Sequence, residues 1–305
     1  MKKKLISGFL SFALIASSVL PAGAIVQPSV PTDGARVWAD DVRVEANRDA
    51  TVKVQFEVDS NSRYTKISGA RASVSIPVDK TGISTATPLQ ITAGENVSTV
   101  RAAPSLGTTG SGKFNLVGSD NVKSLSVNMT VPTVKQTFPI SVTPDYVSAK
   151  EPTGTDSVSL TGDKVNTAFG SVIVQYPVTV KIDGQKPTGA SVSVKTTEYD
   201  TGKKTYAPGG TATELNTDNK FWVDSYTSNN EPVLGITPPE GYTAEVTVND
   251  GTATKSSGNV SLGAVAKDTT VKVKFVQGRD TTVTGGDKPD VKPDGTIVIP
   301  GPDKK

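Results

Sequence analysis

Alternation of apolar and polar residues along most of the chain is the feature that most limits its fold. In residues 51–58, TVKVQFEV, the side chains of Val52, Val54, Phe56 and Val58 lie on one face of an extended chain, and the polar side chains lie on the other. No long segment with a helical period competes with this pattern. The same alternation recurs in residues 72–76, 125–131, 178–182, 192–194, 246–248 and 271–275. The pattern predicts an all-β protein built of antiparallel β-sandwiches, without βαβ units.

The 305 residues include no cysteine and no histidine, which excludes several classes of chemistry. Disulfide bonds, thiol nucleophiles, Ser/His/Asp triads and ordinary zinc sites all need one of these two residue types. Acidic residues such as Glu45, Glu57 and Asp59 are present, but no spacing selects a pair for glycoside hydrolysis. The sequence therefore predicts a protein that is not an enzyme and that uses no metal or cofactor.

The first residues have the order of a secretory signal peptide. Lys2, Lys3 and Lys4 precede an apolar stretch at residues 5–20, and small residues follow up to Ala24. We therefore expect residues 1–24 to be a signal peptide that is removed on secretion. The chain carries no cysteine for lipid attachment and no Leu-Pro-x-Thr-Gly sorting signal. These observations predict an extracellular protein that is associated with the cell surface, if at all, noncovalently.

The charge of the chain is nearly balanced, with 32 Lys and Arg against 30 Asp and Glu. Three of the lysines belong to the signal peptide, so the secreted chain is close to neutral. A surface without a basic stripe argues against nucleic acid as a partner. It also argues against binding to an anionic membrane surface, and no later apolar run is long enough to insert into a bilayer.

Breaks in the strand pattern divide the secreted chain into four parts. These are an extended N-terminal segment at residues 25–36, a β-sandwich at 37–174, a second β-sandwich at 176–276, and a tail at 278–305 rich in Pro, Gly, Asp and Lys. Only Gln175, Tyr176 and Pro177 separate strand-like residues at the junction of the two sandwiches. A connection that short predicts that the two domains are held close together.

The order of features in residues 37–174 resembles a cohesin module. The segments that carry the resemblance are VRVEANRDATVKVQFEVD, ISGARASVSIP, SLSVNMTVPTVKQTFPISVTPDYV and DKVNTAFGSVIV. The resemblance covers nearly half of the chain. It implies a nine-stranded jelly-roll sandwich that receives a dockerin, and therefore an extracellular protein partner.

Residues 176–276 resemble a different group, the CnaB-like or transthyretin-like sandwiches of Gram-positive surface proteins. The segments VTVKIDGQKPTGASVSV, TATELNTDNKFWV and PPEGYTAEVTVNDG carry this resemblance. It implies that Lys181 could form an internal isopeptide bond assisted by Glu214. The last strand, TTVKVKF, offers no Asn or Asp acceptor, and the alternation turns Lys181 outward. The other interpretation of Lys181 is a solvated lysine on a strand.

Two sets of residues are candidates for binding. Arg71, Ser73 and Ser75 point away from the buried side of their strand, and the cohesin resemblance implies partner binding on one sheet face. An ordinary hydrated outer face is the alternative interpretation. Trp222 and Tyr226 could form a flat aromatic platform for a sugar, although most isolated aromatic residues in a sandwich belong to the core or its rim.

The tail contains a short β-branched island, residues 295–300, GTIVIP. This segment is either a linker or a strand that adds to the sheet edge of another copy. The sequence as a whole predicts a noncatalytic protein-binding or scaffolding module at the bacterial cell surface. One alternative is a structural subunit of a filament or matrix that assembles by strand addition, and a further one is a carbohydrate-binding accessory protein.

Overall fold

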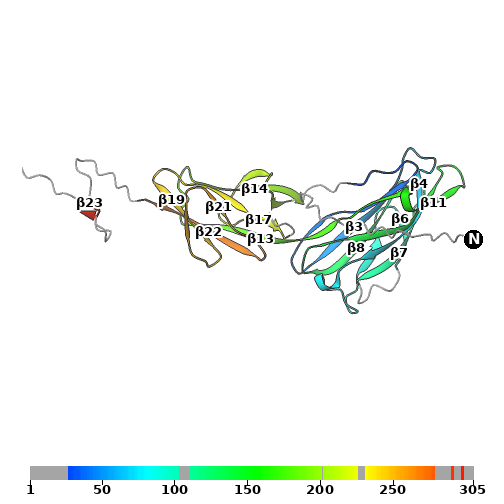
Figure 1. Cartoon of the computed structure of the whole chain (residues 1–305), viewed down its shortest axis with the longest axis horizontal. Helices are drawn as coiled ribbons and strands as arrows, with labels where there is room; N and C mark the ends of the chain where they lie inside the picture. The colour runs from blue at the N-terminus through cyan, green and yellow to red at the C-terminus, as the bar shows by residue number, and fades with distance from the viewer. Residues whose placement is uncertain are drawn as a thin grey trace, which may run out of the picture.

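The computed structural model describes residues 27–102, 110–200, 202–225 and 231–278, together with two short tail strands (Figure 1). The expected signal peptide and Tyr226 lie outside the described residues. The described part of the chain is all-β, as predicted, apart from the 3-10 turns η1 (Val78–Lys80) and η2 (Gly162–Lys164). The tail strands β23 (Asp290–Val291) and β24 (Ile297–Val298) pair with each other.

Two five-stranded sheets form the first sandwich. The order of the first sheet is β12-β1-β3-β8-β5, and the order of the second is β11-β10-β4-β7-β6. The strands of the first sheet are β12 (Val165–Ala168), β1 (Ala35–Ala39), β3 (Arg48–Val58), β8 (Ser124–Val134) and β5 (Gln90–Ala93). Those of the second are β11 (Ser157–Leu160), β10 (Ser141–Lys150), β4 (Lys66–Ser75), β7 (Ser111–Gly118) and β6 (Val97–Ala102).

The inward residues of both sheets meet in one hydrophobic cluster. In β3 the even-numbered residues from Ala50 to Val58 are buried, which is the face that the alternation predicts. Phe56 of the first sheet packs edge-to-face against Phe114 of the second, with ring centroids 6.3 Å apart. Neither side chain is exposed, so these two rings hold the layers of the sandwich together.

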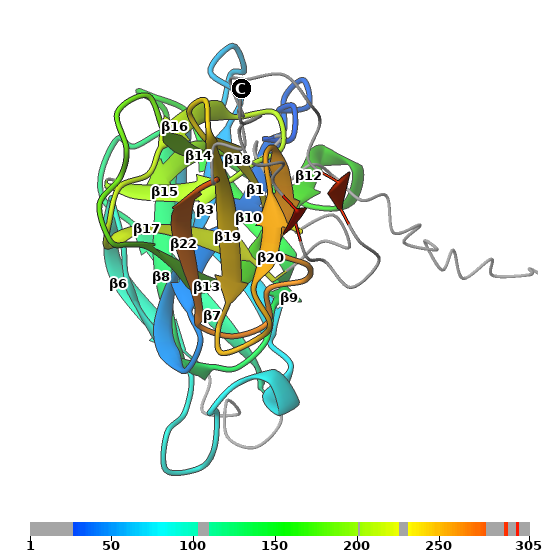
Figure 2. The same ribbon diagram turned by 90° about the vertical axis from the view of Figure 1, so that its left-hand side faces the viewer.

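One large sheet forms the second sandwich and folds over a separate hydrophobic cluster, except at its junction end, where β2, β9 and the start of β13 pack into the first cluster. Its main order is β20-β19-β22-β13-β17-β15-β14-β18-β21, with β16 paired to β14 and with β2 and β9 paired to β13. These strands are β2 (Val42–Glu45), β9 (Phe138–Pro139), β13 (Ser171–Asp183), β14 (Ser191–Asp200), β15 (Lys203–Tyr206), β16 (Thr211–Glu214), β17 (Asn219–Asp224), β18 (Val233–Thr237), β19 (Tyr242–Val248), β20 (Thr254–Ser256), β21 (Asn259–Ser261) and β22 (Thr269–Gln277). Figure 2 views this sandwich from its outer end, with β19 and β22 in front.

Short asparagine turns connect several neighbouring strands. Asn47, between β2 and β3, has φ of 63°, and Asn121 and Asn249 also have positive φ. Asparagine tolerates this left-handed conformation better than other non-glycine residues, because its short polar side chain bonds to nearby backbone groups. These residues therefore end one strand and turn the chain into the next, and at Asn249 the next strand, β20, pairs back on β19.

β13 belongs to both sandwiches and passes through the junction without a break. Its residues Val172 and Val174 lie in the first hydrophobic cluster, and Val178 and Val180 lie in the second. Tyr176 packs against both clusters. Gln175, Tyr176 and Pro177, which separate the two strand-like segments in the sequence, are thus part of a continuous strand. β17 pairs with these three residues as well as with the residues that follow them.

Candidate functional site

The predicted binding residues lie on the outer surface of the second sheet of the first sandwich. Arg71, Ser73 and Ser75 of β4 are partly or fully exposed, whereas the alternating residues Ala72 and Val74 are buried. The alternation places them outward because the opposite side of β4 is packed into the hydrophobic cluster. Their expected direction is therefore what the structure shows.

The neighbouring strands β10 and β7 extend this surface with small polar side chains. Directly paired residues lie on the same side of an antiparallel sheet. The three rows across β10, β4 and β7 are Ser141–Ser75–Ser111, Thr143–Ser73–Lys113 and Tyr146–Arg71–Asn115. We call the surface formed by these nine residues the hydroxyl face.

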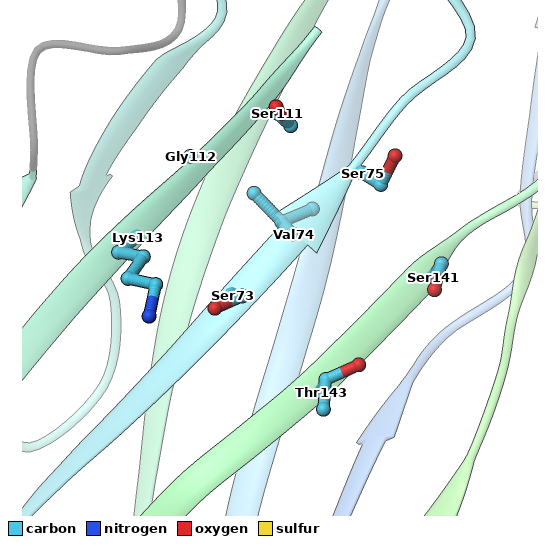
Figure 3. Close-up of a pocket in the computed structure, with 8 residues that line it drawn as sticks. All are labelled: Ser73, Val74, Ser75, Ser111, Gly112, Lys113, Ser141 and Thr143. Atoms are coloured by element: carbon cyan, nitrogen blue, oxygen red, sulfur yellow. The ribbon is translucent and has the colours of Figure 1, made fainter. Parts of the chain in front are cut away.

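A shallow depression lies at one end of the hydroxyl face. Its volume is about 290 Å³, and its lining comes from all three strands (Figure 3). The lining residues are Ser73, Val74, Ser75, Ser111, Gly112, Lys113, Ser141 and Thr143. Hydroxyl groups both donate and accept hydrogen bonds, so this surface suits a polar partner that approaches from above the sheet.

Charged residues lie beside the hydroxyl groups. Asp145 stands at an irregularity in the β10–β4 pairing, between Pro144 and Tyr146. Its Oδ2 atom is 3.1 Å from Arg71 Nε and 3.7 Å from Lys113 Nζ. All three side chains retain between a third and about half of their exposure, so these ion pairs contribute little to stability and leave the charges accessible.

β4 and β7 pack closely where Gly69 pairs with Val117, beside the hydroxyl face. A Cβ atom at Gly69 would lie 2.7 Å from the carbonyl oxygen of Leu116 on β7. Glycine therefore allows β4 and β7 to approach each other at this position. Val117 of β7 is 47% exposed and is a large apolar side chain beside the hydroxyl face.

The candidate sugar platform is only partly described. Trp222 lies on β17 and pairs with Pro177 and Thr205. Its side chain projects from the side of β17 opposite to the buried Phe221 and Val223. The ammonium group of Lys203 lies 5.5 Å from the centroid of the Trp222 ring. A sugar that stacked on this face of the ring would have to displace Lys203, and Tyr226 lies outside the described residues. The platform stays a prediction.

The structure does not place Lys181 and Glu214 as partners. Lys181 is exposed on β13, where Lys272 of β22 is its register partner. Glu214 Oε1 accepts a hydrogen bond from Lys186 Nζ at 2.7 Å. The exposed position of Lys181 agrees with the outward direction that the alternation predicts.

A buried polar cluster at the junction was not anticipated from the sequence. Arg43 Nε lies 3.1 Å from Asp224 Oδ2, and the two side chains are 7% and 5% exposed. The other carboxylate oxygen of Asp224 accepts a hydrogen bond of 2.7 Å from the buried Gln175 side chain. The Arg43 guanidinium also lies 3.6 Å from the centroid of the Tyr199 ring, and burial raises the pKa of Tyr199.

Sequence separation explains why this cluster was missed. Arg43 and Asp224 are 181 residues apart, and neither belongs to a recognisable motif. Lys113 and Asp145 of the first sandwich were also missed, because their relation to Arg71 depends on the register of three strands. The interruption of alternation at Pro144 was the available signal for Asp145, since an irregularity redirects the adjacent side chain.

Metal-binding clusters and membrane-spanning helices are both absent from the described residues. No group of three or more Asp, Glu, His or Cys residues there could hold a metal ion. No helix in that part of the chain is long and apolar enough to span a membrane.

Comparison with known proteins gives matches only among solved structures, since no family model and no curated protein matches the chain. A type I cohesin from Pseudobacteroides cellulosolvens is 15% identical, with 51% of this chain and 96% of that chain covered and a TM-score of 0.31. A non-cellulosomal cohesin from Archaeoglobus fulgidus is 15% identical, with coverages of 46% and 89% and a TM-score of 0.30. The major pilin subunit of Bacillus cereus is 10% identical, with coverages of 80% and 70% and a TM-score of 0.29. These three proteins are structures that this chain resembles. The all-β architecture of this chain is assigned from its own strand pairings.

Proposed function

We propose that the protein is a secreted, noncatalytic binding module that docks an extracellular protein partner on the hydroxyl face. The observation that carries this proposal is the set of small hydroxyl side chains in register across three strands, with Arg71, Lys113 and Asp145 at their side. Arginine at a flat surface with hydrogen-bonding neighbours is typical of protein interfaces.

The shape of the surface favours a protein over a small molecule. Small-molecule sites are concave and bury most of their ligand, whereas the depression on the hydroxyl face is shallow and open to solvent. The face also stands on strands β10, β4 and β7, whose inward residues are packed into the hydrophobic cluster, so its backbone is held in place before a partner arrives. A preformed surface loses little conformational entropy on binding.

A dockerin is the partner to test first, because the resemblance of residues 37–174 to cohesins implies one. The charges of the hydroxyl face supply a second criterion. Arg71 and Lys113 share a single nearby carboxylate, Asp145, so a partner with acidic groups at its centre would complement them.

The test compares three forms of the chain as bait for secreted proteins and for a panel of dockerins. The first is the unmodified chain, and the second carries Arg71→Ala and Lys113→Ala. The third is a matched control with Lys195→Ala and Lys220→Ala, two exposed lysines of the second sandwich. Affinity for any retained partner is then measured by titration.

Binding on the hydroxyl face predicts that the control keeps the affinity of the unmodified chain. The Arg71/Lys113 variant should bind at least about tenfold more weakly, because central interface residues commonly contribute more than about 1 kcal/mol each. Equal binding by all three forms would place the interface elsewhere. Absence of any specific partner would contradict the proposed function itself.

A further inference from the structure

The two ends of the folded chain lie at opposite ends of the molecule. β1 runs toward the junction, since the carbonyl oxygen of Ala39 at its end lies against Gly170, directly before β13. β22 runs parallel to β13 and away from the junction, ending at Gln277. Figure 1 shows β22 and β19 beyond the junction, in the sandwich that lies farther from β4 and β7.

Both end strands are paired in parallel with strands from the middle of the chain. β1 forms four register pairs with β12, from Ala35–Val165 to Trp38–Ala168. β22 forms six register pairs with β13, from Thr269–Val178 to Lys274–Asp183. Only Phe169 and Gly170 separate β12 from β13 in sequence. A short covalent link therefore joins the two parallel pairs.

Tension between the two ends would load both pairs in the same way. Tension would pull the first residue of β1 away from the junction. At the same time, β13 would pull the last residue of β12 toward the junction. Tension would likewise pull β22 outward at Gln277 while β13 was held from the junction. Strands that slide past each other load all their hydrogen bonds together, whereas strands that are peeled from one end load them one at a time.

We propose that the protein carries mechanical tension between its two ends along β1, β12, β13 and β22. The inference goes beyond binding on the hydroxyl face, because it depends on backbone pairing in other strands. The junction supports it: β2 pairs with the first half of β13, and the Arg43–Asp224 ion pair joins β2 to β17. These contacts keep the two halves of β13 in line.

The segment before β1 should detach before this path is loaded. It is held by side-chain hydrogen bonds from Arg36, Lys164 and Asn166 to the carbonyl oxygens of Pro28, Thr32 and Ser29. The bonds from Lys164 and Asn166 are exposed, and separate bonds of this kind are broken one after another. Their loss would lengthen the chain by a few residues without opening either sandwich.

Single-molecule force spectroscopy of the full chain tests the proposal. The chain has no cysteine, so pairs of introduced cysteines give unique attachment points at exposed positions. Gln27→Cys with Gly278→Cys loads the whole path, and Phe169→Cys with Gly278→Cys loads the β13–β22 pair alone. Glu240→Cys with Gly278→Cys is the matched control, because it peels β22 from β19 beginning at the Tyr242–Gln277 pair. Urea unfolding of each variant shows whether it folds like the unmodified chain.

The proposal predicts that the second sandwich opens at a force at least about twofold higher from positions 169 and 278 than from positions 240 and 278, since forced unfolding depends on the barrier along the pulled direction. The force needed to open the β1–β12 pair alone is measured with attachment at positions 27 and 169. Pulling from positions 27 and 278 should show no major opening at a force below that of the weaker of the two parallel pairs. Equal forces in the shearing and peeling geometries would overturn the proposal. So would an early opening of either sandwich at low force from positions 27 and 278.

Discussion

Replacing Asp224 with alanine removes the anion from the buried ion pair at the junction. Arg43 and Asp224 are 7% and 5% exposed, so the variant leaves a guanidinium charge buried beside the Tyr199 ring without its carboxylate. Breaking one side of such a pair costs about 3–5 kcal/mol. The buried Gln175 amide also loses one of its two acceptors and keeps Thr205 Oγ1. A buried donor left without a partner costs about 1–3 kcal/mol, and this cost overlaps with the first because both act through the same carboxylate.

We therefore expect Asp224→Ala to lower the free energy of unfolding by about 3–5 kcal/mol, a large share of the roughly 5–15 kcal/mol of a typical protein. Urea denaturation followed by tryptophan fluorescence measures this change. If the free energy of unfolding falls by about 3 kcal/mol per molar urea, the midpoint of unfolding should lie about 1–2 M lower in the variant. Since β13 belongs to both sandwiches, a single transition is expected in both forms of the chain.

Two controls separate the buried charge from other effects of the substitution. The double variant Arg43→Met with Asp224→Leu removes both charges and should recover most of the lost stability. Glu198→Gln removes one partner of the exposed Lys204–Glu198 pair and should change stability by less than about 1 kcal/mol. A cost for Asp224→Ala as small as that of Glu198→Gln would refute the reasoning from burial.

Three further predictions concern the core, the pH dependence and the tail. Phe114→Ala should cost about 3–5 kcal/mol in urea unfolding, because the ring is fully buried against Phe56; a cost below about 1 kcal/mol would contradict this packing. Stability should be constant between about pH 6 and 8 in a chain without histidine, and should fall as the pH rises above about 10, because burial raises the pKa of Tyr199 and Tyr206 in the folded state. Tyr199→Phe should make that alkaline loss shallower in urea titrations at several pH values, and an unchanged slope would exclude Tyr199 as its source. If the tail assembles copies by strand addition, sedimentation at high concentration should show oligomers that deletion of residues 295–300 abolishes, whereas a monomer in both forms would contradict that alternative.

The central strands were predictable because their burial creates the pattern. In β3 from Ala50 onward, and in β4 from Ala70 onward, every second residue is packed into the core, so selection for packing is visible as alternation. The edge strands β5 and β6 have no fully buried residue, and nothing in their sequences distinguishes inward from outward positions. Short edge strands of this kind are defined by pairing with a neighbour, which a local pattern does not contain.

The direction of Arg71, Ser73 and Ser75 followed from the same alternation, but the hydroxyl face as a whole did not. Its other members depend on which strands lie beside β4 and on their register, and β10 is more than 60 residues away in sequence. The continuity of β13 was also hidden, because Pro177 usually indicates a break. Pro177 lies where the strand beside β13 changes from β2 to β22, a place where the missing N–H group is tolerated.

The shared strand β13 also determines how the protein can be divided for study. A truncation at Tyr176 would leave each fragment with half a strand and would expose backbone groups that β2, β17 and β22 now cover. Uncovered strand edges promote aggregation, so fragments cut at this point should express poorly. Each sandwich is better produced with residues 171–183 included in both fragments, which gives either half its own copy of the strand.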